Sequence, residues 1–243
     1  MARKPSASKE TARYSTPPKD LSEHPFYGMA SELDEEQRVF RDAIWSNDYD
    51  IVFCNAKSGS GKTTIAVATA MLMYEYGLIN GIVYMSAAGV HEYKQGLLPG
   101  SLEEKSQFNH LPLKQALIKI GHDPEKIISS DINSIAQKEG TAAILAQTDS
   151  YIRGINIGDI DNKTLLLVDE CQNFTRSALR AVLSRLNNGK AVVIGHDKQC
   201  DLKYPQDSAF TAAIALYQPF KRCKVCNLSH SYRGWIAEIA DMI

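Results

Sequence analysis

The sequence contains no apolar run that approaches the roughly 18 residues of a membrane-spanning helix. Its N-terminus has no hydrophobic core of the kind that a secretion signal needs. Cysteine is scarce, and five thiols, an odd number, do not make the framework of a disulfide-stabilised domain. Neither sign of charge dominates, because 27 Lys and Arg stand against 28 Asp and Glu. We therefore expect a reduced, soluble, cytoplasmic protein with no membrane partner, and not one that coats nucleic acid through bulk positive charge.

Length and composition fit one large domain with appendages. The 243 residues, 44 % of them hydrophobic, are enough for a packed core. Residues 1–27 hold four prolines among Ser, Thr, Lys and Glu without an apolar period, and we predict a mostly disordered tail there. We predict that residues 28–243 form a single domain. Within it, the irregular segment 88–162 is expected to be an insertion or accessory helices at the edge of the sheet.

Apolar, β-branched runs alternate with helical patterns along this domain. Near-continuous hydrophobic runs are typical of strands that are buried on both faces of a mostly parallel sheet; they occur at 51–54, 82–85, 165–168 and 191–194. Helical spacing is found at 63–76, 175–187 and 207–217, and an earlier helix follows the acidic turn Asp34-Glu35-Glu36. Strands that alternate with helices imply right-handed βαβ units, so we predict an α/β fold with helices on both faces of the sheet.

The segment Ala56-Lys57-Ser58-Gly59-Ser60-Gly61-Lys62-Thr63 lies between a predicted strand and a predicted helix, as a phosphate-binding P-loop does. Its glycines let backbone N–H groups curl around phosphate oxygens without interference from a Cβ atom. Lys62 can reach the β- and γ-phosphates, and the Thr63 hydroxyl can bind Mg²⁺. The strict motif begins with Gly, which is Ala56 here. We predict a nucleotide site formed by Ala56, Lys57, Ser58, Gly59, Ser60, Gly61, Lys62, Thr63 and Thr64.

Another predicted strand ends in two acids, Asp169 and Glu170. Doubly wound sheets bind their ligands at the carboxyl ends of the strands. Asp169 is expected to hold Mg²⁺, and Glu170 to accept a proton from the attacking water, as in P-loop hydrolases. Gln199 follows a third strand, where it either senses the γ-phosphate, orients the water, or is an ordinary loop residue.

Several of these motifs resemble one family. Asp169-Glu170-Cys171-Gln172-Asn173 is similar to the Asp-Glu-Ala-Gln-Asn signature of the PhoH-like (phosphate-starvation-inducible) ATPases, relatives of superfamily 1 helicases. Gly96-Leu97-Leu98-Pro99-Gly100 resembles their Gly-Phe-Leu-Pro-Gly, and further similarities lie at Glu104-Lys105, Arg153-Gly154, 184–190 and 199–202. Three departures suggest a divergent, phage-encoded member. Ser86-Ala87 replaces Arg-Pro, and His196 replaces Asp, so that a third acid near the metal is either missing or supplied by Asp197. Residues 228–233 resemble the Tyr-Arg motif of superfamily 1 helicases.

The resemblance implies a RecA-like ATPase core that binds ATP and Mg²⁺ and acts on single-stranded RNA or DNA, in a bacterial or phage-infected cytoplasm. It places Gln37 where helicase relatives read adenine, the alternative being an exposed helix glutamine. Those helicases take an arginine finger from a second RecA-like domain, and the chain after residue 195 is too short to form one. We therefore expect a homo-oligomer, such as a hexameric ring, in which Arg185 or Arg233 serves a neighbour's site. Either arginine could instead act in cis or pair with a local carboxylate.

Two other functions remain open at this point. The Asp-Glu-Cys-Gln-Asn-Phe stretch is also similar to a thymidine-kinase motif, and Cys223 and Cys226 could begin a zinc ribbon, although no second ligand pair follows. A nucleotide-binding switch with little turnover is the other alternative. Phosphate release in the absence of a nucleoside argues against the kinase, and stimulation by single-stranded nucleic acid argues against the switch.

Overall fold

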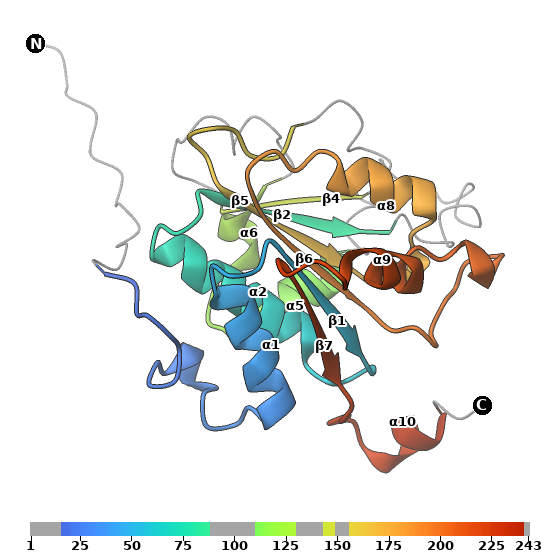
Figure 1. Ribbon diagram of the computed structural model, residues 1–243. Coiled ribbons are helices and arrows are strands. Elements are labelled where there is room, and N and C mark those ends of the chain that lie inside the picture. Colours follow the sequence, from blue (N-terminus) through green and yellow to red (C-terminus); the bar gives the residue numbers. More distant parts are fainter. Residues whose placement is uncertain (1–15, 88–109, 130–142, 149–155, 241–243) are drawn as a thin grey trace, which may run out of the picture.

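The computed structural model describes residues 16–87, 110–129, 143–148 and 156–240. Within these residues, seven strands form one sheet in the order β3-β4-β2-β5-β6-β1-β7, and each neighbouring pair is parallel (Figure 1). The strands are β1 (Ile51–Ala56), β2 (Gly81–Ser86), β3 (Ile128–Ser129), β4 (Ile144–Thr148), β5 (Thr164–Asp169), β6 (Gly189–Gly195) and β7 (Cys223–Leu228). The predicted α/β fold with a parallel sheet is confirmed.

Helices cover both faces of the sheet (Figure 1). On one face lie α1 (Glu35–Trp45), α2 (Lys62–Glu75) and α5 (Leu111–Lys119), and on the other lie α8 (Arg176–Leu183) and α9 (Phe210–Tyr217). The shorter elements are η1 (Phe26–Gly28), α6 (Pro124–Ile127), η4 (Cys171–Asn173), η5 (Pro205–Asp207) and α10 (Trp235–Ala240). None of the helices in these described ranges is long and apolar enough to cross a membrane.

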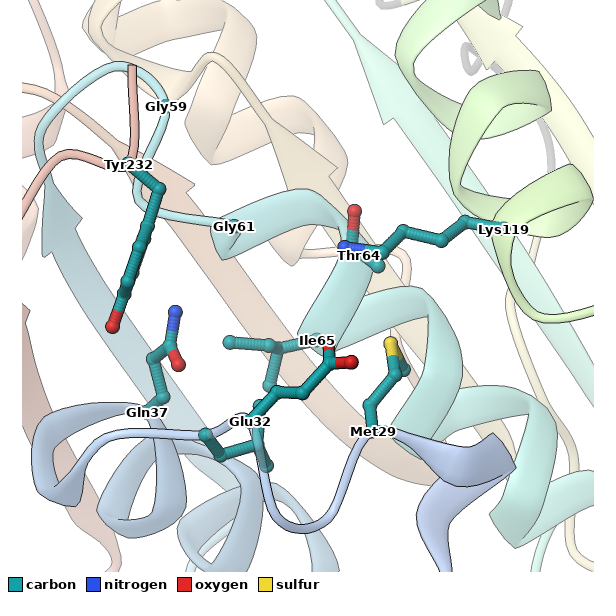
Figure 2. Close-up of a pocket in the computed structure, with 10 residues that line it drawn as sticks. Met29, Glu32, Gln37, Gly59, Gly61, Thr64, Ile65, Lys119 and Tyr232 are labelled. Carbon is teal, nitrogen blue, oxygen red and sulfur yellow. The ribbon is translucent and has the colours of Figure 1, made fainter. Parts of the chain in front are cut away.

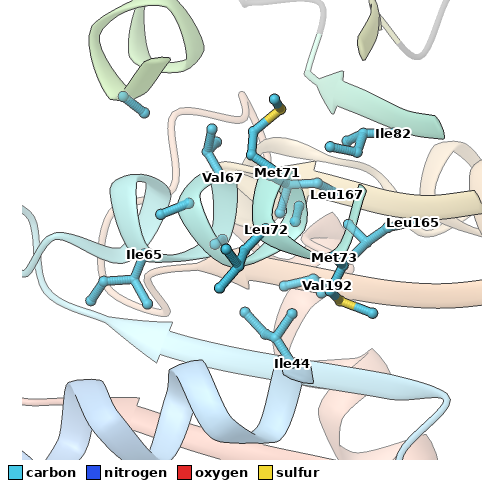
Figure 3. Packing of buried hydrophobic residues seen from close by; sticks show 14 of the residues in the cluster. Ile44, Ile65, Val67, Met71, Leu72, Met73, Ile82, Leu165, Leu167 and Val192 are labelled. Atoms are coloured by element: carbon cyan, nitrogen blue, oxygen red, sulfur yellow. The ribbon is translucent and has the colours of Figure 1, made fainter. Parts of the chain in front are cut away.

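Successive side chains of each strand point to opposite faces of the sheet, and so they form two hydrophobic cores. Leu165 and Leu167 of β5 pack under α2, while Leu166 and Val168 face α8 and α9. Both faces are buried, which explains why the strands are continuous apolar runs rather than alternating ones. Figure 3 shows the first core, where side chains of α2 fill the space over β2, β5 and β6. The close-packed sheet provides a rigid support for the loops at its carboxyl edge.

The structure differs from the predictions at both the tail and the insertion. Residues 16–27 are not a solvated tail, because Leu21 and Phe26 are fully buried and Trp45 Nε1 donates a hydrogen bond to the Pro18 carbonyl. Two strands that the sequence did not predict, β3 and β4, extend the sheet from within the expected insertion 88–162. The Leu-Pro-Gly segment 96–100, Glu104-Lys105 and Arg153 lie outside the described residues.

A buried lysine ties α1 to the sheet. Lys190, on β6, donates hydrogen bonds from Nζ to the carbonyls of Ala43, Ile44 and Ser46 at the C-terminus of α1. These carbonyls have no partner within the helix, and an ammonium group there is also favoured by the helix dipole. Burial lowers the pKa of Lys190 from its usual 10.5 to about 8. The side chain is therefore structural, and it is not available to a basic surface groove.

We predict that Lys190 makes the stability of the protein depend on pH above about 8. Between that value and 10.5 the unfolded chain holds a proton that the folded chain has lost, so stability rises with pH. The free energy of unfolding of the wild type, relative to Lys190→Met, should rise by up to about 1.4 kcal/mol per pH unit. Urea titrations of both proteins from pH 7.5 to pH 10 would measure it, and a constant difference would contradict the prediction.

Candidate active site

The loop between β1 and α2 has the geometry of an anion cradle. Gly59 and Gly61 have φ values of +77° and +81°, a region that only glycine adopts without strain, and Gly61 is the N-cap of α2. The 14-residue helix α2 therefore begins directly at the loop, with its first N–H groups and its dipole at the cradle. The hydroxyl of Ser60 is buried without a hydrogen-bond partner among the described residues. This arrangement fits an anionic ligand.

Parallel strands β1 and β5 bring the predicted catalytic residues together. Lys62 Nζ lies 2.9 Å from Glu170 Oε1. The hydroxyl of Thr63 donates a hydrogen bond of 3.0 Å to Asp169 Oδ2. The two pairs are 106 residues or more apart in sequence, yet they lie at one edge of the sheet. The four residues predicted to bind the metal and to do the chemistry thus form a single cluster.

Asp169 is a completely buried carboxylate. Burial and the neighbouring Glu170 raise its pKa, while Lys62 and the hydroxyls of Tyr84 and Thr63 act in the opposite direction. Its Oδ1 accepts a hydrogen bond from the backbone N–H of Glu170, and its Oδ2 accepts from Thr63 and Tyr84. Carboxylate and hydroxyl oxygens beside a phosphate cradle are the ligands that Mg²⁺ prefers. Thr63 and Asp169 would hold the ion.

Glu170 is held in a strained conformation. Its φ of 50° and ψ of 43° are left-handed, which costs a non-glycine residue on the order of 1 kcal/mol or more. Burial opposes its charge, but Lys62 and hydrogen bonds keep its pKa below the usual value. The second carboxylate oxygen accepts a 2.6 Å hydrogen bond from Gln172 Nε2. Strain that persists at a polar cluster is typical of a functional position.

Gln172 connects Glu170 to the end of β6. Its Oε1 accepts a 3.0 Å hydrogen bond from the backbone N–H of His196, and the residue is buried. A Cβ atom on Gly195 would approach that Oε1 to 2.9 Å, so the close contact requires glycine there. The sequence pattern included Gln172 but did not assign it a role. An amide two residues after the second acid of such a strand is the signal that could have found it.

The loop after β6 packs on the η4 segment. Cys200 Sγ contacts the carbonyl of Gln172, and Asp201 donates its N–H to Asn173 Oδ1. Gln199 therefore lies in the loop that follows β6, at the carboxyl edge of the sheet. Asp197 also follows β6, where its N–H bonds to Asn55 Oδ1. The two sequence motifs at 169–173 and 199–202 are thus one structural unit.

A C-terminal strap, which we define as residues 229–233, lies across the P-loop. Ser231 Oγ donates a hydrogen bond to the carbonyl of Ser58, and the N–H of Tyr232 donates to the carbonyl of Gly59. Ser229 bonds the carboxylate of Glu36, and the Tyr232 hydroxyl donates a 2.7 Å bond to Asp34 Oδ2. The strap therefore joins the start of α1 to the phosphate cradle.

Of the two candidate arginines, only Arg233 lies at the cradle. A Cβ atom on Gly59 would come within 2.4 Å of Arg233 Cγ. The guanidinium of Arg233 has no ion-pair partner among the residues that the structure describes. Arg185 lies between the end of α8 and the start of β6, at the opposite edge of the sheet from the P-loop. Within one chain the two arginines therefore lie at opposite ends of the strands.

A pocket of about 350 Å³ opens beside the P-loop (Figure 2). It is lined by Met29, Glu32, Leu33, Gln37, Gly59, Gly61, Thr64, Ile65, Lys119 and Tyr232. In Figure 2, Gln37 and Tyr232 lie on the same side of the pocket, near Gly61. Gln37 is buried rather than exposed: its Nε2 donates to the carbonyl of Ser60, and its Oε1 accepts from the N–H of Asp34. The pocket has the position and mixed polarity of a nucleobase site.

The family model of the PhoH-like proteins matches residues 30–233 of this sequence. This chain belongs to the PhoH-like family. A PhoH-like protein from Mycobacterium leprae (strain TN) is 30 % identical over 197 residues, which are 79 % of this chain and 51 % of that protein. A PhoH-like protein from Synechocystis sp. is 31 % identical over 196 residues, 80 % of this chain and 55 % of that protein. The chain spans about half the length of these curated relatives.

A solved structure, the DUF1998 helicase MrfA bound to DNA, shares the fold with a TM-score of 0.50 and 12 % sequence identity. The alignment covers 89 % of the PhoH-like chain and 29 % of the helicase. At that identity the likeness concerns the fold alone. It confirms the predicted RecA-like core, and together with family membership it makes the chain a P-loop protein of the nucleotide-binding class.

We predict that Gly59→Ala weakens nucleotide binding through the strap. The new Cβ atom would displace Arg233, and the alanine would have to adopt a left-handed backbone conformation. Gly121 serves as the control, because it has a similar φ of +82° but no atom within 4 Å of its Cβ position. Both substitutions should lower stability by about 1 kcal/mol. Only Gly59→Ala should lower the affinity for a fluorescent ATP analogue, by about tenfold. Equal affinities for the two variants in a fluorescence titration would show that the contact with Arg233 does not matter.

Proposed function

We propose that this PhoH-like chain binds Mg²⁺-ATP and hydrolyses it, and that hydrolysis is coupled to single-stranded RNA or DNA. The observation that supports it is the cluster in which Lys62 and Thr63 of the P-loop meet Asp169 and Glu170 of β5. A phosphate cradle alone would serve a binding protein. An ionised carboxylate beyond the metal ligand supplies the general base that a hydrolase needs.

Each residue in the cluster has a distinct task in this proposal. Lys62 and the N–H groups of the loop bind phosphate oxygens, and Thr63 and Asp169 bind the metal. Bound Mg²⁺ would neutralise charge on the β- and γ-phosphates. Glu170 accepts the proton of the attacking water, and Gln172 fixes the orientation of its carboxylate. Gln199, at the same edge, is the candidate to orient that water or to sense the γ-phosphate.

The pocket of Figure 2 supports adenine as the base. Gln37 has one further Nε2 hydrogen and one further Oε1 lone pair beyond the bonds to Ser60 and Asp34. An amide with one donor and one acceptor matches the N7 and N6 edge of adenine. Tyr232 offers an aromatic face at the same side of the pocket. The two bonds that Gln37 already makes would hold its amide in register for the base.

A few exposed basic residues at the carboxyl edge of the sheet also support a nucleic-acid partner. Three basic residues are exposed there: Lys57 follows β1, Arg176 begins α8, and Lys198 follows β6. Lys163 precedes β5 at the other edge, and Lys190 is buried. Phosphate contacts by such a small basic set would make binding moderately dependent on salt.

The first test is phosphate release from ATP by the wild type and by Glu170→Gln, with and without single-stranded RNA or DNA. We predict that the substitution lowers turnover by roughly 10²–10⁴-fold, because it removes the base. Affinity for ATP should stay within about threefold. Tight ATP binding with no phosphate release under any of these conditions would contradict the proposal and favour a nucleotide-binding switch. Release that requires a nucleoside would favour a nucleoside kinase.

Arg233 is proposed to act in cis on the γ-phosphate, and Arg185 to act across an interface of a homo-oligomer. Mixing experiments separate the two roles, because an arginine supplied by a neighbour can be complemented. Arg185→Ala mixed with Glu170→Gln should regain activity, since a subunit with an intact base then meets an intact Arg185. Arg233→Ala mixed with Glu170→Gln should stay inactive. Each single variant should lose roughly 10³-fold or more in turnover if its arginine stabilises the transition state.

A recovery of activity in the Arg233→Ala mixture would place that arginine in trans. Failure of the Arg185→Ala variant to lose activity would remove it from the mechanism. Sedimentation of each variant at the assay concentration is the control, because a loss of assembly would imitate a loss of the finger.

A further inference from the structure

A tyrosine from the middle of β2 reaches the metal-binding carboxylate. Tyr84 is fully buried, and its hydroxyl donates a 2.8 Å hydrogen bond to Asp169 Oδ2. The same oxygen accepts the hydrogen bond from Thr63. Tyr84 is paired in register with Leu167, two residues before Asp169, so its ring lies along the neighbouring strand with the hydroxyl at the strand end.

Packing alone does not explain a tyrosine at this position. Ile82, two residues earlier on the same face of β2, is apolar, and so are the α2 side chains around it. Phe or Leu would fill the same space as Tyr84. A hydroxyl buried there is costly unless it has a hydrogen-bond partner. The ring is held from the side by the edge of His110, at a centroid distance of 6.1 Å. The orientation of the phenol is therefore fixed before any ligand arrives.

The hydrogen-bond pattern separates the role of Tyr84 from that of Thr63. The Thr63 hydroxyl would bind a metal ion through an oxygen lone pair while its O–H still donates to Asp169, so Thr63 would itself be a ligand. The two other donors to the carboxylate, the Tyr84 hydroxyl and the N–H of Glu170, are not expected ligands and act only on Asp169. They come from β2 and from the residue that follows β5, and between them they bind both oxygens of the carboxylate.

We propose that Tyr84 is a positioning residue for Mg²⁺: its hydrogen bond to Asp169 holds the carboxylate in the orientation in which it receives the ion. The inference rests on the proposed function, since it requires that Asp169 serve the metal. Groups that orient a metal ligand commonly contribute roughly 10–100-fold to metal affinity. The Tyr84 hydroxyl is buried and bonds to Asp169, so its removal should leave metal-free nucleotide binding unchanged.

The test compares Tyr84→Phe with Tyr217→Phe. Tyr217 also packs on the sheet, against Phe53, and no hydrogen bond of its hydroxyl is found among the described residues. Free Mn²⁺ is measured by electron paramagnetic resonance during titration of each protein with a non-hydrolysable ATP analogue present. Binding of a fluorescent ATP analogue in EDTA is measured in parallel.

We expect Tyr84→Phe to lower the affinity for Mn²⁺ by about tenfold. Its affinity for the nucleotide in EDTA should stay within twofold of the wild type. Tyr217→Phe should change neither affinity. Mn²⁺ affinity within twofold of the wild type would overturn the inference. If the wild type itself does not bind Mn²⁺ with the nucleotide, the proposed function fails, which is a different outcome.

A second variant covers the case in which Tyr84→Phe does not fold. If the hydroxyl serves the buried charge, then adding Asp169→Asn should restore a cooperative unfolding transition, because the charge that lost its donor is gone. Failure to fold in both backgrounds would assign Tyr84 to packing and overturn the proposal.

Discussion

The site depends on one buried carboxylate. Asp169 ends β5 in the interior of the protein, where an ion without partners would be strongly unfavourable. Its oxygens are satisfied by the hydroxyl of Tyr84 from β2, the hydroxyl of Thr63 at the start of α2, and the N–H of the next residue. Those donors come from three elements, so the carboxylate is stable only when the strand register and the helix start are all correct. The same requirement places the P-loop and the acids within reach of one ligand.

Sheet order explains how the C-terminal strap reaches the P-loop. β7 is the edge strand and pairs in parallel with β1 from Ile51 to Ala56. The segment that follows β7 therefore starts next to the P-loop, which follows β1. The strap then crosses the cradle and bonds the start of α1. Tyr232 thus reaches the pocket and Arg233 the P-loop. The exposed side chains of α10, which follows directly, include Trp235 and Ile236.

The sequence was informative where the physical signal is local. Four strands, the P-loop and the pair Asp169-Glu170 were predicted because buried strands are continuous apolar runs and because the loop has fixed spacing. Strands β3 and β4 were missed, since two and five residues in an irregular segment give little periodicity. Tyr84 could not have been assigned, because its partner is 85 residues away and the run around it reads as plain core. The ordered stretch 16–27 was missed for a similar reason: a few apolar residues among prolines, such as Leu21 and Phe26, show no period, yet they are buried.

The ion pair between Lys62 and Glu170 links the phosphate cradle to the base under the proposed function. One ammonium group cannot neutralise Glu170 fully while it also binds phosphate oxygens. With the cradle free of ligand, Lys62 keeps the pKa of Glu170 low, and a carboxylate in that state is a weak base. Once Lys62 turns to the phosphates, burial of Glu170 acts with less opposition, and its affinity for a proton rises. The bond from Gln172 and the left-handed backbone hold the carboxylate in place during that change. Under the proposed function, the move of Lys62 would therefore couple phosphate binding to the basicity of Glu170, and the strain at Glu170 is consistent with a functional role.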